Sequence, residues 1–457
     1  MKKISLLLLV FAIVLVSGCN KKEAQPETKI NKKEYAEKVK KEFMHAWNAY
    51  KKYAWGHDAL KPLSKKPHDW YGQSFLMTPV DAFDTMVLMG LDEEVAKTKE
   101  LIFSKLDFDK DVKVQNFEIT IRMLGGLISA YMWDGDERFL KLATDLADRL
   151  LPVFNSPTGM PYVFVNLKTG KVEGNINNPA EIGTLLIEFG ALSKLTGNNI
   201  YYEKAKKAMM GLVERTTKVG LVGTTINVET GEWIIKECHL SGMLDSYFEY
   251  LLKAGILFND KECMDAWKES IVAINKYLAD DTVDGLWYSH VNSETGERIR
   301  TQFGALDAFF PAVLALGGDL DRAKALQENC FKMWTKFGIE PEQYNYKTGE
   351  VLSAPYFLRP ENIESAYYLY HYTKDEKYIK MGKTYLESLI KYCRAEEGYS
   401  HLESVVTKEK SDNMESFFFA ETLKYLYLLF DEEQSMKFDD VIFNTEAHPF
   451  KKSFIKN

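Results

Sequence analysis

Five short segments of the sequence place carboxylates beside arginine, aromatic or hydroxyl side chains. They read FEITIRMLGG (117–126), SGMLDSYFEY (241–250), LRPENIES (358–365), MESFFFAETLKY (414–425) and FNTEAHP (443–449). Paired carboxylates with aromatic walls are what the hydrolysis of a glycosidic bond requires. The segments therefore favour an enzyme that acts on sugars.

Helical spacing would bring several of these charges together. Glu118 and Arg122 are four residues apart, so they would share one face of a helix. Such a pair contributes little at a surface, but the neighbours of this one, Phe117 among them, are apolar. Asp245 and Glu249 have the same spacing, and like charges on one face repel unless something bridges them. We interpret the first pair as functional, whereas a solvated acidic face explains the second equally well.

The third and fourth segments add further acids on predicted helices. Glu361 and Glu364 would occupy the first turns of a helix, with Arg359 just before them. An arginine fork suits a carboxylate or a pair of sugar hydroxyls. Glu415 and Glu421 lie in an otherwise aromatic segment, which a purely hydrophobic core does not explain. We interpret both segments as parts of a polar binding site.

Other kinds of chemistry lack their sequence signatures. The chain has no HExxH, GxSxG, Walker A or GxGxxG motif, and its eight histidines show no metal-ligand spacing. Beyond Cys19 the cysteines are widely spaced, which excludes a zinc ribbon. With 457 residues, 46% of them hydrophobic and 27% charged, the composition is that of a soluble globular protein. A net charge of −8 disfavours binding to nucleic acid.

A helical repeat is predicted to position the acidic segments. Residues 124–151, 185–215 and 364–393 each pair an apolar helix with an amphipathic one across a short polar turn. An apolar helix must be buried, and its amphipathic partner would cover it. Units of this kind stack into arrays of αα-hairpins. The fold class is therefore predicted to be all-α.

An acidic residue stands near the start of each predicted buried helix. In chain order these acids are Asp81, Glu118, Glu181, Asp245, Asp307, Glu361 and Glu415. The helix dipole explains each one singly, but a buried carboxylate without a partner or water is costly. A wet central cavity would remove that cost. The set indicates a closed ring of seven hairpins whose carboxylates converge at one mouth.

The first residues are typical of a targeting segment. Residues 1–18 combine two lysines with an apolar run too short to span a bilayer comfortably, as signal peptides do. VSGC (16–19) resembles a bacterial lipobox, which implies cleavage before Cys19 and lipidation of its sulfur; an ordinary signal peptide is the alternative. Residues 19–32 would then form a lipidated tether, and residues 33–457 the catalytic domain. We expect a protein of the bacterial cell envelope that meets the membrane only through its lipid.

Together the motifs resemble the class I α-mannosidases of glycoside hydrolase family 47. The resemblance begins with HDALKPLSKKPHDWYGQSFLMTPVDAFDTMVLMG (57–90), passes through the segments above in order, and ends at FNTEAHP (443–449). It implies an (α/α)7 barrel closed by a C-terminal plug. It also implies calcium-dependent, inverting hydrolysis of terminal α-1,2-linked mannose from mannans or high-mannose glycans. We expect a monomer whose partner is an oligosaccharide containing α-mannose.

The resemblance assigns roles residue by residue. Glu118 matches the proposed general acid of the family, and Asp245 matches a third catalytic carboxylate that is sometimes itself proposed as the acid. Either residue could therefore be the acid here. Glu361 matches the general base that activates the attacking water. The matches to sugar-contacting residues are Arg122, Arg359, Glu364 and Glu415.

The last motif carries the implied metal site. Thr445 matches the family's only direct protein ligand of Ca²⁺, through its hydroxyl and carbonyl oxygens, with waters and sugar hydroxyls as the other ligands. An oxygen-only site of this kind suits a hard cation. Glu421 and Glu446 would hold the metal-bound waters.

Two positions depart from the family pattern. Met243 stands where the family often carries an arginine or leucine that tunes the choice of glycan branch, so no branch preference is implied. ALDAFFP (305–311) replaces a HLVCF-like stretch, so that histidine and its structural cysteine are absent. The second departure is similar to the ER-degradation-enhancing branch of the family.

Two other functions stay open at this point. The first is a catalytically weak, lectin-like lipoprotein on the same fold, although all three catalytic carboxylates are present. The second is another α/α-barrel carbohydrate enzyme, such as an epimerase or an unsaturated glucuronyl hydrolase. Those enzymes generally have six hairpins and lack a segment like NTEAH (444–448).

Overall fold

A computed structural model describes residues 30–455 of the chain. The predicted signal peptide, Cys19 and most of the predicted tether lie outside these residues. The described chain forms one unit from α1 (Lys32–Ala54) onward. No helix within it combines the length and the apolar character that crossing a membrane requires. Its four cysteines are buried and free.

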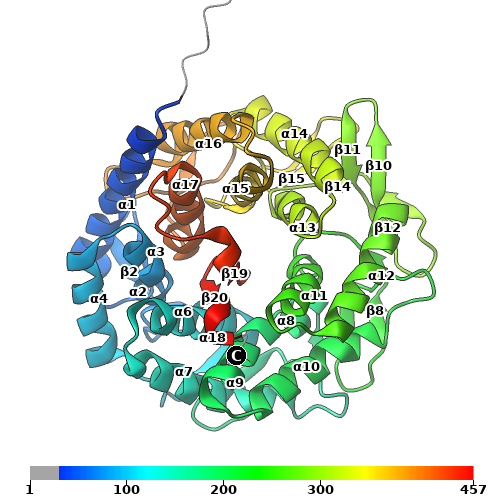
Figure 1. The fold of residues 1–457 in the computed structure, drawn as a ribbon, viewed down its shortest axis with the longest axis horizontal. Coiled ribbons are helices and arrows are strands. Elements are labelled where there is room, and N and C mark those ends of the chain that lie inside the picture. The colour runs from blue at the N-terminus through cyan, green and yellow to red at the C-terminus, as the bar shows by residue number, and fades with distance from the viewer. Residues whose placement is uncertain (1–29, 456–457) are drawn as a thin grey trace, which may run out of the picture. The chain divides into compact units, whose positions relative to one another are not determined.

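Successive helices pack in pairs of one buried and one covering helix. The pairs are α3 (Phe83–Leu88) with α4 (Asp92–Lys105), α6 (Gly125–Asp134) with α7 (Glu137–Leu150), α9 (Leu186–Thr196) with α10 (Ile200–Val213), α11 (Asp245–Leu257) with α12 (Lys261–Tyr277), α13 (Phe310–Leu316) with α14 (Leu320–Phe337), and α15 (Glu361–Thr373) with α16 (Lys377–Ser388). The last buried helix, α17 (Leu423–Phe430), packs against α1. The helices form a ring around the C-terminal hairpin (Figure 1).

The pair α6–α7 illustrates why the sequence folds this way. Gly135 ends α6 in the left-handed conformation, with φ of 83°, which glycine adopts at little cost. Asp136 then caps α7, because its side chain accepts a hydrogen bond from the Arg138 amide. The buried residues of α7 recur at helical spacing and face α6: Phe139, Ala143, Leu146, Ala147 and Leu150. The predicted helix pairs in 124–151, 185–215 and 364–393 are confirmed.

Short helical segments precede the buried helices and carry much of the chemistry. They are α2 (Met77–Asp81), α5 (Asn116–Ile119), the π-helix η1 (Thr120–Leu124), α8 (Pro179–Gly183), the 3₁₀ turn η3 (Leu306–Phe309) and the π-helix η5 (Phe418–Thr422). The remaining segments are η2 (Leu151–Phe154), η4 (Leu389–Cys393), η6 (Phe438–Asp440) and α18 (Lys452–Ile455). Isolated π-turns are rare and occur often at functional sites.

The prediction of an all-α fold omitted a set of short antiparallel strands. They pair as β1 (Ala59–Lys61) with β2 (Lys66–His68), β3 (Lys113–Gln115) with β4 (Phe164–Asn166) and β5 (Val172–Glu173), β6 (Ile176–Asn177) with β7 (Thr225–Asn227) and β8 (Trp233–Ile235), β9 (Glu237–Cys238) with β12 (His290–Asn292) and β13 (Arg298–Arg300), β10 (Ala279–Thr282) with β11 (Gly285–Tyr288), β14 (Gln302–Phe303) with β15 (Gln343–Asn345) and β16 (Val351–Ser353), β17 (His401–Leu402) with β18 (Lys410–Ser411), and β19 (Val441–Phe443) with β20 (Pro449–Lys451). The chain is thus mostly helical, with strands confined to connections between helices.

One turn motif builds four of these hairpins. The sequence N-x-x-T-G occurs at 166–170, 227–231, 292–296 and 345–349. In each copy the asparagine side chain accepts hydrogen bonds from the amides two and three residues later. Each glycine has a positive φ, between 68° and 76°. The motif is an Asx-turn that glycine closes, and it predicts a hairpin wherever it occurs.

The C-terminal hairpin β19–β20 lies inside the ring (Figure 1). Gly125 and Gly126 allow this close approach. A Cβ on Gly125 would lie 2.6 Å from the side-chain nitrogen of Asn444, and one on Gly126 would lie 3.2 Å from the ring of His448. Asn444 also donates a hydrogen bond to the carbonyl oxygen of Ile121, at 2.9 Å. The C-terminal segment therefore packs against the start of α6 inside the ring; we call residues 441–451 the plug.

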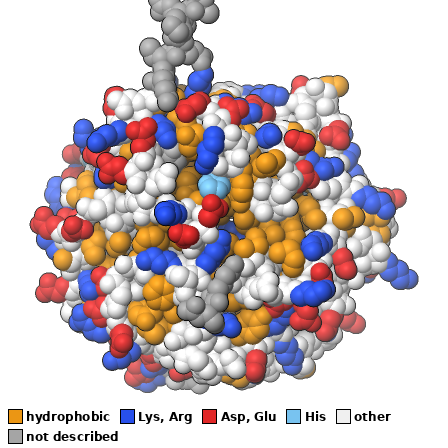
Figure 2. Space-filling model, viewed as in Figure 1, with side chains coloured by type: hydrophobic (Ala, Val, Ile, Leu, Met, Phe, Trp, Pro, Cys, Tyr) orange, Lys and Arg blue, Asp and Glu red, His pale blue; other side chains and the backbone are white. Residues whose placement is uncertain are grey.

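The face seen in Figure 2 carries acidic and basic side chains interspersed with apolar ones. Neither sign of charge dominates this face. A single-sign field that would steer a polyelectrolyte is therefore not a feature of this side of the molecule.

Candidate active site

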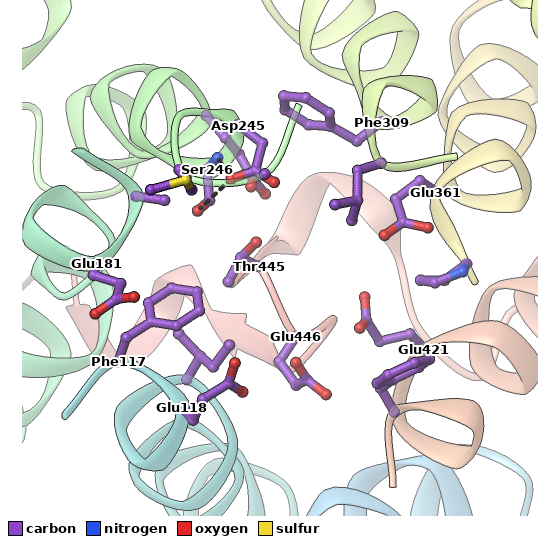
Figure 3. A pocket seen from close by; sticks show the side chains of 18 of the residues that line it. Phe117, Glu118, Glu181, Asp245, Ser246, Phe309, Glu361, Glu421, Thr445 and Glu446 are labelled. Carbon is purple, nitrogen blue, oxygen red and sulfur yellow. Dashed lines mark hydrogen bonds between the residues drawn. The ribbon is translucent and has the colours of Figure 1, made fainter. Parts of the chain in front are cut away.

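A cavity of about 280 Å³ lies within the ring and gathers residues from all five sequence motifs. Carboxylates surround it: Glu118, Glu181, Asp245, Glu249, Glu361, Glu364, Glu421 and Glu446. Figure 3 shows Thr445 of the plug between Glu118, Asp245, Glu361, Glu421 and Glu446. Phe117, Phe309 and Phe417 add aromatic walls. Segments far apart in the sequence thus meet in one site.

Only four of the seven predicted helix-start acids line this cavity: Glu118, Glu181, Asp245 and Glu361. The expectation that all seven converge was wrong for Asp81, Asp307 and Glu415. Glu415 lines an adjoining cleft. Asp81 and Asp307 are buried and have partners in the protein, because Ser416 donates to Asp81 and the Gly304 amide donates to Asp307 at 2.9 Å. Such partners offset part of the cost of burial.

The predicted pair of Glu118 and Arg122 is formed. The Nε and Nη2 atoms of Arg122 each lie 2.9 Å from one carboxylate oxygen of Glu118. Arg122 sits in the π-helix η1 and also binds Glu446 of the plug. Burial lowers the pKa of Arg122, but the surrounding carboxylates, Glu446 first, raise it above its usual value. The arginine therefore ties the second helix pair to the plug.

Asp245 begins α11 and points into the cavity (Figure 3). Burial, together with the charge of Glu249, raises the pKa of Asp245 to about 6. The solvated acidic face considered for this pair is wrong, because Glu249 is only 4% exposed. Glu249 instead binds the buried Lys253 one turn later. Lys253 supplies the bridging charge that two acids on one helix face need.

The RPEN segment places three charges at the start of α15. Arg359 forks onto Glu342, with N–O distances of 2.9 and 3.2 Å. Burial raises the pKa of Glu361 to about 7, against an opposing effect of Arg359. Burial likewise raises the pKa of Glu364 to about 8, and the Tyr425 hydroxyl donates to its carboxylate at 3.2 Å.

Backbone strain marks three of the site segments. Met243, Leu358 and Ala447 adopt left-handed conformations, with φ of 79°, 62° and 58°. Each lies within two residues of a predicted site residue. Non-glycine residues rarely adopt this conformation, and it concentrates at functional sites.

The carboxylates of Glu421 and Glu446 interact electrostatically beside Thr445 (Figure 3). Burial and then the charge of Glu446 raise the pKa of Glu421 well above its usual value. Burial raises the pKa of Glu446 to about 8, against the opposing effect of Arg122. The Thr445 amide donates to the Tyr250 hydroxyl at 3.2 Å. Among residues 30–455, no cluster of three or more His, Cys, Asp or Glu side chains has the geometry of a metal site.

Sequence reasoning missed the residues that anchor the plug. Asp84, Lys424 and His448, which we call the plug anchor, are fully buried. Lys424 Nζ and His448 Nδ1 lie 2.6 and 2.7 Å from the two carboxylate oxygens of Asp84. Lys424 also donates to the Ala447 carbonyl oxygen at 2.7 Å. A lysine inside the apolar run LKYLYLLF (423–430) was the available signal.

Sequence reasoning also missed the contacts of Tyr250 and Glu188 with the segment around Thr445. Tyr250 donates to the buried Glu188 at 2.6 Å while it accepts from the Thr445 amide. Asn444 donates to the same oxygen of Glu188 at 2.8 Å. The backbone of the plug is thus held on both sides of Thr445.

Comparison with known proteins gives consistent results. The sequence profile of glycosyl hydrolase family 47 matches residues 42–452. The human ER degradation-enhancing alpha-mannosidase-like protein 2 is 38% identical over 450 residues, which span 91% of this chain and 77% of that protein. The mannosyl-oligosaccharide 1,2-alpha-mannosidase MNS1 of Arabidopsis thaliana is 37% identical over 93% of this chain and 80% of its own length.

The fold is also similar to solved structures. The alpha-1,2-mannosidase from Trichoderma reesei aligns with a TM-score of 0.85 and 30% identity, covering 92% of this chain and 99% of that chain. A cellobiose 2-epimerase from Bacillus thermoamylovorans aligns with a TM-score of 0.57 and 13% identity, which is a likeness of fold alone.

Proposed function

Because this chain belongs to glycosyl hydrolase family 47 and is a glycoside hydrolase, we propose that it removes terminal α-1,2-linked mannose from mannans or high-mannose glycans. Relatives that carry the name of this activity support the proposal. The observation that carries it is the meeting of Glu118, Asp245 and Glu361 in one cavity, beside Thr445 (Figure 3). Separate neighbourhoods for these side chains would have left no common site for a sugar.

The three carboxylates suit an inverting hydrolysis. Glu361, as base, would take a proton from the attacking water, and a carboxyl across the cavity would protonate the leaving oxygen. Burial raises the pKa of Asp245 to about 6, so Asp245 can hold a proton near neutrality. The raised pKa of Asp245 suits the role of proton donor.

The residues around Thr445 fit a bound Ca²⁺. Thr445 offers oxygen donors, which a hard cation prefers. Glu421 and Glu446 are buried beside it, and their mutual repulsion helps keep the pKa of Glu421 well above its usual value. A divalent cation would relieve that repulsion. When bound, it would orient a sugar through its hydroxyls and offset the acidic field of the cavity.

Two further expectations join the proposal. We propose that the helix pairs form the closed (α/α)7 barrel, a view supported by the packing of α17 against α1. We also propose that the protein acts as a monomer on the bacterial envelope, anchored through lipidated Cys19, on the strength of the lipobox-like VSGC (16–19). Membrane fractionation of wild type and Cys19→Ala tests the anchor.

Hydrolysis of α-1,2-mannobiose, with and without EDTA, tests the function. We expect free mannose that first appears as the β-anomer by NMR, and loss of its release in EDTA that added Ca²⁺ restores. Release of the α-anomer would overturn the inverting mechanism. Binding of mannobiose without turnover would overturn the hydrolase and favour the lectin-like alternative.

A further inference from the structure

Asp307 is a buried carboxyl without a role in the proposed hydrolysis. It lies in the 3₁₀ turn η3 and is 2% exposed. Its carboxylate accepts hydrogen bonds from the Gly304 amide, at 2.9 Å, and from the Ser241 hydroxyl. Its neighbours Leu306 and Phe309 line the cavity, but Asp307 does not. Any effect of Asp307 on a bound sugar must therefore pass through another residue.

Ser241 connects Asp307 to the start of α11. Its side chain bonds to Asp307, while its carbonyl oxygen accepts from the Asp245 amide at 3.2 Å. Leu306 packs on the same segment, because a Cβ on Gly242 would lie 3.1 Å from the Cδ1 atom of Leu306. The turn η3 thus supports the segment that places Asp245.

The supported segment has a strained backbone. Met243 is left-handed, with φ of 79°, and its carbonyl oxygen accepts from the Ala180 amide at 2.9 Å. A residue with a side chain keeps this conformation only where the surrounding structure fixes it. Here α8 holds the segment through Ala180 and η3 holds it through Asp307. The position of the Asp245 carboxyl depends on both supports.

The charges of Asp307 and Asp245 also interact. Burial raises the pKa of Asp307 to about 7, and the charge of Asp245 adds to this effect. Repulsion between two carboxylates is mutual, so an ionised Asp307 makes Asp245 hold its proton more tightly. Because the pKa of Asp245 is about 6, Asp245 is short of its proton above neutral pH. Asp307 ionises in that same range.

Other charged and titratable groups face this pair from each side. Glu249, on the same helix, raises the pKa of Asp245, and Arg359 lowers it. Glu361 interacts with Asp245 across the cavity (Figure 3). Near Asp307, burial keeps the pKa of the Cys330 thiol well above its usual value, so that thiol stays neutral. A variant that changes only Asp307 leaves all these groups in place.

We propose that Asp307 acts through Asp245 as a positioning residue, which fixes segment 241–244 and whose negative charge retains the proton that Asp245 donates. The inference rests on the proposed function, in which Asp245 suits the role of proton donor. Without Asp307, Asp245 would still carry its proton at low pH. Above neutral pH a smaller fraction of Asp245 would carry it.

Mannose release from α-1,2-mannobiose at pH 5 and pH 8, by the full chain in saturating Ca²⁺, tests the proposal. Asp307→Asn keeps the size of the side chain and an acceptor for the Gly304 amide, but it carries no charge. At pH 5 the variant and the wild type should have similar rates, because Asp307 is then protonated. At pH 8 the variant should be roughly three- to tenfold slower, as expected if the pKa of Asp245 falls by about half a unit to one unit.

Two further variants sharpen the test. Asp58→Asn is the matched control, because Asp58 is also buried, accepts backbone amides and has a pKa raised by burial, to about 6. Its rate relative to the wild type should be the same at both pH values. Ser241→Ala keeps the carboxyl of Asp307 but removes a hydrogen bond that favours the ionised form. It should reproduce part of the loss at pH 8 if Asp307→Asn does not fold.

An equal loss at both pH values in Asp307→Asn would overturn the proposal, because a merely structural role predicts that result. An unchanged rate at pH 8 would overturn it as well. If only Ser241→Ala folds, a change that is independent of pH would have the same consequence. Failure of the proposed function is distinct, because the wild type would then release no mannose at either pH, and Asp245 would lose its role as donor.

Discussion

The cavity and the plug anchor are two buried clusters of charge that differ in pairing. In the anchor, Lys424 and His448 outweigh burial and lower the pKa of Asp84 to about 2. Asp84 and Asp81 in turn raise the pKa of His448 to about 9, against the effect of burial. In the cavity, burial raises the pKa of Asp245 to about 6 and of Glu361 to about 7. The plug anchor therefore stays charged near neutral pH, whereas Asp245 and Glu361 exchange protons in that range.

Stability and chemistry in this ring depend on different clusters of charge. Buried ions that are fully paired keep their charge over a wide range of pH and position the plug. Buried carboxyls without a matching cation exchange protons near neutrality, which is what acid–base catalysis requires. The plug joins the two clusters, since Thr445 and Glu446 face the cavity while His448 lies in the anchor.

The largest expected effect is on turnover. Glu361→Gln removes the proposed base while keeping the size of the side chain, so mannose release should fall roughly 10²–10⁴-fold. The affinity for mannotetraose should change far less, because the sugar contacts remain. Release assays paired with calorimetry measure both. Glu350→Gln, in the β15–β16 connection, is the matched control, and near-native release by Glu361→Gln would remove Glu361 from the role of base.

The next largest effect is on stability. Lys424→Met leaves the buried Asp84 with His448 as its one remaining charged partner, which should cost about 3–5 kcal/mol of unfolding free energy. Lys97→Met, which breaks an exposed pair with Glu93, should cost about 1 kcal/mol or less. Chemical denaturation measures both. Equal costs for the two variants would mean that the anchor contributes no more than a surface pair.

The sequence predicted the helices better than the strands, for a local reason. Apolar periodicity within 124–151 or 364–393 suffices to specify a buried helix and its cover. The strands are two to four residues long, too short for a periodic signal. The four copies of N-x-x-T-G coincide with turns between strands. The hairpins at those positions could therefore have been predicted from this repeat, although the helical pattern is the stronger signal.

The site was predicted in part, and the limit is the distance between partners in the chain. Helical spacing identified Glu118 with Arg122, and Asp245 with Glu249, because each pair lies on one helix. It could not identify Asp84 with Lys424 and His448, because three separate elements supply them. The misjudged acids, Asp81 and Asp307, have the same position on their helices as the cavity acids. What distinguishes them is that they do not line the cavity, and the spacing of acids along the chain does not show which of them do.

Catalytic activity and the stability contributed by the plug anchor should depend on pH in different ranges. Glu361 must be ionised to act as base and Asp245 protonated to act as acid, so with pKa values of about 7 and about 6 activity should peak between pH 6 and 7 and fall about tenfold per unit below about pH 6. The anchor should hold over this range. The lowered pKa of Asp84 gives stability that is lost only as pH falls from about 4 towards 2. The raised pKa of His448 gives stability that is lost as pH rises through about 9.

Rate assays and melting temperatures across pH 4–9 measure the two together. Activity should be lost between pH 6 and 4 while the melting temperature holds or rises, since cavity carboxyls with raised pKa values stabilise the fold when protonated. A melting temperature that falls in parallel with activity would mean that acid unfolds the plug, and that Glu361 is not the group being titrated.

The smallest expected effect lies at the border between the clusters. Tyr250→Phe removes the hydroxyl that donates to Glu188 and accepts from the Thr445 amide. The lost bonds should cost about 1–3 kcal/mol of stability, because both partners stay buried. If Thr445 binds Ca²⁺, the Ca²⁺ concentration for half-maximal mannose release should also rise several-fold. Tyr277→Phe, on the covering helix α12, should change neither quantity. A stability loss without any change in the Ca²⁺ response would assign Tyr250 to the scaffold alone, and the plug would then position Thr445 through the anchor and Asn444.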